Sequence, residues 1–218
     1  MKRIIKSAAL LSLPIVFLFM LIFSPSAGLN ENGQDPGYLS GSGEDIVKIA
    51  LSQTGNVGGS PYWSWYGFEN RVPWCACFVS WCANEAGYID SGIIPKYAAC
   101  REGVRWFEEH EQWEDNSYSP KPGDIVFFDW NLDGVSDHTG IVQYVEGDKV
   151  VTVEGNTSSG NNADGDHVEQ KVRGRTYILG FGTPLYPFSG SDLTGNSVEE
   201  QVYNYLISAG FSKASACG

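Results

Sequence analysis

Two residues of this chain have the types and the local settings needed for nucleophilic catalysis, and Cys75 is the first. The string VPWCACFVSWCANEAG has Pro73 near its start and Gly87 at its end, which predicts a helix over about residues 74–86. Cys75 then lies in the first turn, where free N–H groups and the helix dipole favour a thiolate. The alternative is a buried, inert thiol on the apolar face of the helix.

His138 is the histidine best placed to act as a base for Cys75. His110 ends an acidic helical stretch and His167 lies in a polar segment, so both are predicted to be surface residues. His138 directly precedes the apolar run TGIVQYV, so its ring would project from the end of a strand, which is a rigid mount for a catalytic group. The alternative is a structural histidine at a strand end.

A catalytic histidine also needs a polar group that fixes its tautomer, and Glu154 and Asn156 are the candidates. The segment between His138 and these residues is predicted to be a β-hairpin. A three-residue loop would set His138 opposite Asn156 and Gly140 opposite Glu154, all on one face of the sheet. A two-residue loop would place both candidates on the other face from His138. The sequence permits both registers.

The elements that must position these residues are helices followed by strands. Apolar periodicity predicts helices over residues 44–54 and 97–110, and an aromatic loop over 62–68. Short apolar runs separated by turns then predict antiparallel strands in DIVFFDW, TGIVQYV, KVVTVEG and TYILGFG. This order indicates an α+β fold, with N-terminal helices packed on an antiparallel β-sheet.

Four short strings, PWCACFVSW, GDIVFF, DHTGIV and VEGN, resemble in order the motifs of the CHAP domain, the cysteine, histidine-dependent amidohydrolase/peptidase of the papain-like cell-wall hydrolases. The resemblance covers about residues 44–187. It implies a papain-like fold, with Cys75 as nucleophile, His138 as base, and Glu154 and Asn156 as supports of the histidine.

The same resemblance implies a substrate and a reaction. The substrate would be bacterial peptidoglycan, cut at an amide bond by an amidase or an endopeptidase, with no required cofactor. One departure is a second cysteine, Cys77, which would be a bystander or a disulfide partner. The competing function is a non-catalytic wall-binding or scaffold module on the same fold.

The charge of the chain limits its partners. There are 14 Lys plus Arg against 26 Asp plus Glu, a net charge of -12, so nucleic acid is discounted as a partner. Bacterial walls are also usually anionic, so binding to them would have to come from a shaped groove.

The termini predict export and further segments. MKRIIK precedes an apolar run of 16 residues and then SPSAG, which is the layout of a signal peptide or an N-terminal membrane anchor. Either leaves the rest of the chain extracellular, facing the cell wall, with membrane contact only through this segment. The tail EEQVYNYLISAGFSKASACG resembles the start of a phage-tail-type lysozyme domain. The predicted segments are the signal or anchor 1–28, a linker 29–43, the catalytic domain 44–188, a linker 189–196 and the truncated second domain 197–218.

Five cysteines leave at least one thiol unpaired. Cys77 and Cys82 are five apart in a predicted helix, about 8 Å between Cα atoms, which is beyond disulfide reach. The sequence does not decide whether Cys100 forms a disulfide with Cys77 or Cys82. The pairing of Cys217 is likewise undetermined.

The loop DWNLDGVSD has the spacing of a calcium loop at its positions 1, 3, 5 and 9 and a glycine at position 6. Its twelfth position is Gly140, where such loops need a bidentate Glu. The two readings are a structural calcium site and an ordinary solvated turn. The predicted ligands are Asp129, Asn131, Asp133 and Asp137.

Overall fold

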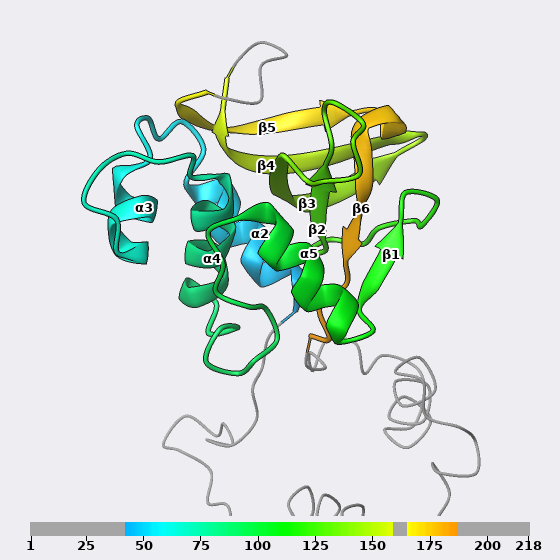
Figure 1. The fold of residues 1–218 in the computed structure, drawn as a ribbon, viewed down its shortest axis with the longest axis horizontal. Coiled ribbons are helices and arrows are strands. Elements are labelled where there is room, and N and C mark those ends of the chain that lie inside the picture. Colours follow the sequence, from blue (N-terminus) through cyan, green and yellow to red (C-terminus); the bar gives the residue numbers. More distant parts are fainter. Residues whose placement is uncertain (1–41, 159–164, 187–218) are drawn as a thin grey trace, which may run out of the picture. The chain divides into compact units, whose positions relative to one another are not determined.

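The computed structural model describes residues 42–158 and 165–186 (Figure 1). Helices occupy the first half of this part of the chain and strands the second half. The predicted α+β fold, with N-terminal helices packed on an antiparallel sheet, is confirmed.

The strands of the described residues form one six-stranded sheet in which every neighbouring pair is antiparallel. Its spatial order is β1-β6-β2-β3-β4-β5, so the last strand, β6, is inserted beside β2. The strands are β1 (Trp113–Asp115), β2 (Ile125–Phe128), β3 (His138–Glu146), β4 (Lys149–Thr157), β5 (His167–Arg173) and β6 (Ile178–Gly182).

The helices gather to one side of the sheet (Figure 1). They are α2 (Gly43–Ser52), α3 (Ser60–Tyr66), α4 (Cys75–Glu85) and α5 (Cys100–Glu109). The central helix is α4, which packs on β3 and β4 and is also contacted by α2 and α3. The predicted boundaries of α4 are correct to within a residue. Because α4 lies directly on the strands that carry His138 and Glu154, its first residue is brought to them.

Both faces of the sheet are covered at β2. Ile125 and Phe127 belong to the large core beneath the helices, whereas Val126 and Phe128 belong to a second, smaller core on the opposite face. A strand buried on both faces has no polar positions to alternate with apolar ones, which explains the unbroken run IVFF.

The β3–β4 hairpin contains a feature that neither predicted register included. Its turn is the two-residue one, because Glu146 pairs with Lys149. A β-bulge between Val142 and Tyr144 then shifts the pairing by one residue, so that Ile141 lies opposite Val153. The bulge thereby restores, at the far end of the hairpin, the register that a three-residue loop would have given.

In this shifted register, the Glu154 side chain packs directly against Gly140. A Cβ atom built on Gly140 would lie 2.7 Å from Cγ of Glu154. The absence of a side chain at Gly140 therefore leaves the space that the Glu154 side chain occupies, on the face of the sheet that carries His138.

The predicted aromatic loop over 62–68 was wrong, because its first part is the helix α3. Pro61 lies in the first turn of α3 and Gly67 caps its end, two signals of a short helix. Seven residues are too few for a stable isolated helix. Stacking of the Tyr62 ring on Trp74, with an edge contact to Phe78, supplies the packing that stabilises it.

Two strands were not predicted, β1 and β5. The segment of β5, HVEQKVR, has only two apolar residues, and its first residue, His167, was assigned to a polar segment. Its polar side chains include Arg173, which pairs with the buried carboxylate of Glu154 on β4, as described below.

Several predicted segments lie outside the described residues: the signal or anchor 1–28, nearly all of the linker 29–43, the linker 189–196 and the second domain 197–218 with its resemblance to a lysozyme domain. Within residues 42–158 and 165–186, no helix is long and apolar enough to cross a membrane.

Candidate active site

The Cys75 thiol lies at the start of α4, as predicted. Cys75 is the first residue of the helix, and the preceding Trp74 gives the helix no side-chain cap. The pKa of the thiol is held well below its usual range, first by a hydrogen bond with Cys100 and then by His138, and the backbone N–H of Ala76 adds to this. These contacts outweigh burial, which acts in the other direction. The site therefore favours a thiolate at Cys75.

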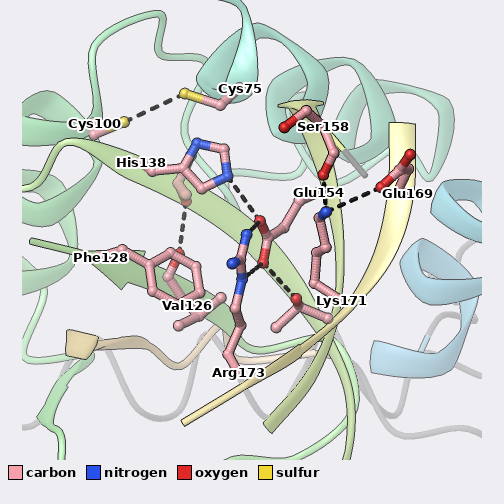
Figure 2. A network of polar contacts seen from close by, with 12 residues as sticks. Cys75, Cys100, Val126, Phe128, His138, Glu154, Ser158, Glu169, Lys171 and Arg173 are labelled. Atoms are coloured by element: carbon pink, nitrogen blue, oxygen red, sulfur yellow. Dashed lines mark hydrogen bonds and ion pairs between the residues drawn. The ribbon is translucent and has the colours of Figure 1, made fainter. Parts of the chain in front are cut away.

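The His138 imidazole lies between the Cys75 sulfur and the Glu154 carboxylate (Figure 2). Its Nε2 is 2.9 Å from Oε2 of Glu154, and both side chains are almost completely buried. Burial alone would lower the pKa of His138, but hydrogen bonds and charge attraction from Cys75 and Glu154 raise it to about 9. The imidazole is therefore held in the cationic form beside a thiolate.

Glu154 is a buried carboxylate that is fully partnered. Burial would raise its pKa, but two hydrogen bonds from Arg173, the bond from His138 and their positive charges lower the pKa to about 2. The hydroxyl of Thr152 also donates to Oε1 at 2.6 Å. A buried charge is tolerated when it is paired and hydrogen-bonded in this way. Glu154 thus stays ionised while it orients the imidazole.

Arg173 is a member of the site that the sequence analysis missed. Its Nε donates to Oε1 of Glu154 at 2.8 Å and its Nη2 donates to Oε2, a two-pronged contact. The guanidinium also lies over the rings of Phe128 and Trp130, at 5.5 and 5.1 Å from the ring centroids. The sequence gives no comparable signal for Arg173, because in HVEQKVR three polar residues separate Val168 from Val172 and no strand alternation is evident.

Removing the Arg173 charge is expected to destabilise the protein strongly, because Glu154 would be left as a buried carboxylate with one cation fewer. For Arg173→Met, we expect the free energy of unfolding to fall by about 3–5 kcal/mol. Arg105→Met is the matched control, because Arg105 pairs with Glu109 on the exposed surface and should lose less than about 1 kcal/mol. Urea denaturation measures the free energy of unfolding of both variants. Equal losses would contradict a stabilising role for the buried Arg173–Glu154 pair.

Of the two predicted supports of His138, Glu154 provides the hydrogen bond to the imidazole. Asn156 is also buried, two residues further along β4, at the irregularity between Glu154 and Thr157. Its φ of 56° is in the left-handed region, which Asn tolerates better than most residues.

The disulfide of Cys100 with Cys77 or Cys82, which the sequence left open, is not present. Cys75, Cys77, Cys82 and Cys100 are all free. The neighbour of Cys100 is Cys75, with 3.7 Å between the two sulfurs, rather than Cys77 or Cys82 (Figure 2). Sequence analysis did not predict this contact. Cys217 lies outside the described residues.

The two histidines that were predicted to lie at the surface are exposed to different degrees. His110 is exposed and stacks on Trp106. His167 begins strand β5, is only partly exposed, and forms a bridge with Val57, so the polar segment to which it was assigned is in part a strand.

The predicted calcium loop directs its oxygens to its own backbone. Asp129 accepts N–H bonds from Asp133 and Gly134, and Asp137 accepts one from Trp130. Asn131 in turn accepts one from Asp133. Within the described residues, no group of three or more His, Cys, Asp or Glu side chains is arranged to hold a metal ion.

Calcium binding by this loop is a prediction that melting temperature tests. A bound ion should raise the melting temperature of chelator-treated protein when excess calcium is added, because the ion binds the folded loop in preference to the unfolded chain. An unchanged melting temperature would contradict calcium binding by this loop.

Comparison with known proteins gives one family match and several structural likenesses. A crystal structure of Ly7917 has 17% identity and a TM-score of 0.42 over 66% of this chain and 63% of that one. A second structure of Ly7917, with the hydrolyzing product of MDP, has 16% identity and the same TM-score and coverage. A protein similar to lipoprotein, of the NLP/P60 family from Staphylococcus aureus, has 15% identity and a TM-score of 0.36, over 70% of this chain and 45% of that one.

This chain spans 63% of the length of the Ly7917 structures. No curated protein gives a significant match. Residues 67–156 match the CHAP domain family, and this stretch contains Cys75, His138, Glu154 and Asn156.

Proposed function

We propose that the chain is a cysteine-dependent peptidoglycan hydrolase, an N-acetylmuramoyl-L-alanine amidase or an endopeptidase of the peptide part of the wall. The match to the CHAP domain supports peptidoglycan hydrolysis. The observation that carries the proposal is the line of buried groups from the Cys75 sulfur through the His138 imidazole to Glu154. A nucleophile, a base and a group that orients the base are the parts that acyl transfer requires.

In the proposed mechanism, the Cys75 thiolate attacks the carbonyl carbon of an amide bond. The resulting oxyanion is stabilised by backbone N–H groups near the start of α4, which have no side-chain cap. Protonated His138 gives its proton to the leaving amine, which leaves an acyl group on Cys75 as a thioester. His138, now neutral, takes a proton from water as the water attacks the thioester, and the thiolate is restored.

The test is hydrolysis of purified bacterial walls by the reduced protein. We expect the turbidity of the walls to fall and new amino groups to appear in solution, because each cut amide releases one amine. Mass spectrometry of the fragments then identifies the bond. Stem peptides freed from the sugar at L-alanine indicate an amidase, and shortened stems indicate an endopeptidase. Binding to walls without release of amines would instead support the wall-binding module.

The pH dependence of hydrolysis should follow the thiolate–imidazolium pair. The rate should rise as pH climbs through the lowered pKa of Cys75, because the thiol becomes a thiolate. It should fall as pH passes about 9, because His138 loses the proton needed by the leaving amine. The profile of kcat/KM against pH measures both limbs.

A control for this profile is the pKa of His138 in the variant Cys75→Ala, followed by NMR. It should lie below the value of about 9, since the bond and the charge of Cys75 both raise it. An unchanged pKa would show that Cys75 does not interact with the imidazole.

A further inference from the structure

Cys75 and Cys100 face one another in a way that the hydrolytic mechanism does not require. Each is the first residue of a helix, Cys75 of α4 and Cys100 of α5, and their sulfurs are 3.7 Å apart. A disulfide has an S–S length of about 2.05 Å, so the sulfurs would need to approach by about 1.7 Å. Figure 2 shows that no other labelled side chain lies between the two sulfurs.

The other two cysteines of the described residues differ from this pair. Cys77 and Cys82 are completely buried, whereas Cys75 and Cys100 are 5% and 8% exposed. Burial raises the pKa of Cys77 to about 12 and also raises that of Cys82. Reagents that attack thiolates would therefore react at Cys75 and not at Cys77 or Cys82.

We propose that Cys75 and Cys100 form a reversible disulfide that inactivates the site, so that hydrolysis depends on a reducing step. This inference rests on the proposed function only for its effect on activity, because formation of the disulfide is a separate property of the two thiols. Oxidation would remove the nucleophile itself, since a sulfur bonded to Cys100 cannot attack a carbonyl carbon.

The oxidant is a low-molecular-weight disulfide, written RSSR. The Cys75 thiolate attacks one sulfur of RSSR, forming a Cys75–SR mixed disulfide and releasing RS⁻. The Cys100 sulfur then attacks the Cys75 sulfur and displaces the second RS⁻. The proton of Cys100 and one from solvent complete two RSH. Two cysteines are oxidised and one RSSR is reduced, so the electrons balance.

The environment of Cys100 suits the second step. Its pKa is raised, first by the hydrogen bond to Cys75, then by burial and by the charge of Cys75. Once Cys75 carries the mixed disulfide, its negative charge is gone, and two of these causes go with it. Cys100 can then lose its proton more easily, and it does so at the moment when it is needed as the attacking group.

The experiment uses the full chain with Cys217→Ser, which removes the one cysteine outside the described residues. Oxidised glutathione is the probe, followed by wall hydrolysis and by intact-mass and peptide mass spectrometry. We expect the oxidised protein to lose two hydrogens without keeping glutathione, and to yield one peptide pair joined through Cys75 and Cys100. Its hydrolytic activity should fall at least tenfold and return with dithiothreitol.

Two variants on the same background make the result specific. Cys100→Ser should stop at the first step and keep one glutathione on Cys75 until reductant is added. Cys77→Ala should behave as the parent does, because Cys77 takes no part. The oxidised parent should also melt at a higher temperature than the reduced form, since the bond closes a loop between residues 25 apart in sequence.

Three results would overturn the proposal: a parent protein that keeps glutathione without forming the 75–100 link, a link between other cysteines, or a linked protein with full activity. Failure of the proposed function would be seen differently. In that case the link would form and be found by mass spectrometry, while the reduced protein would release no amines from walls.

Discussion

Cys75→Ala is expected to abolish the hydrolysis of purified walls, whereas Cys77→Ala is expected to keep most of it. The two residues are on the same turn of α4 and are chemically identical, so the difference must come from their surroundings. The Cys75 sulfur interacts with Cys100 and His138, which lower its pKa and give it a base. Cys77 is fully buried, and burial raises its pKa to about 12, so it stays a thiol.

The comparison needs a check that both variants fold, because both remove a sulfur from the large core. Loss of one buried sulfur should cost on the order of 1 kcal/mol, so activity should be measured well below the melting temperature of each variant. A folded but inactive Cys77→Ala together with an active Cys75→Ala would mean that the wrong thiol has been assigned as nucleophile.

The helix that carries Cys75 could be predicted from the sequence because its signals are local. Pro73 and Gly87 mark its limits through backbone conformation alone, and the structure places α4 between them. The strand after His138 was equally evident from its apolar residues. Local signals thus located the two residues of the candidate site that carry the reactive groups.

The relation between the two strands of the hairpin could not be predicted in the same way. The turn has two residues, which taken alone would have set Glu154 on the wrong face from His138. The bulge between Val142 and Tyr144 reverses that outcome, and no residue there signals a bulge by its type. The bulge depends on contacts between residues far apart in sequence. One of these is the packing of the Glu154 side chain against Gly140.

Arg173 and Cys100 were missed for a related reason. Arg173 is 19 residues from Glu154 and Cys100 is 25 residues from Cys75 in sequence. Each contact depends on how separate elements pack, and neither residue belongs to a sequence motif. Polar residues on a strand usually face solvent. The sequence therefore does not indicate that Arg173 faces the buried carboxylate of Glu154 instead.

His138→Ala is expected to leave no measurable hydrolysis, and the losses for its supports should be smaller and graded by contact. The imidazole holds the proton that leaves Cys75 as a thiolate, and it then gives this proton to the leaving amine. No other described group is placed to do both. Glu154 makes the hydrogen bond to Nε2. Glu154→Ala should therefore lower kcat by roughly 10²-fold with little change in KM, because orientation of the base matters in the transition state. Asn156→Ala should lower kcat by less.

The control for Glu154 is Glu169, which lies directly opposite it on β5 and pairs with Lys171 rather than with the imidazole. Glu169→Ala should keep nearly full activity. The pH dependence of the rate is a second measurement, because the hydrogen bond and the charge of Glu154 both raise the pKa of His138. In Glu154→Ala the fall in rate at alkaline pH should therefore begin below the pH of about 9 expected for the parent. A folded Glu154→Ala with the kcat and the pH profile of the parent would show that Glu154 does not support the histidine. Equal losses in Glu169→Ala would show that the effect does not depend on contact with the imidazole.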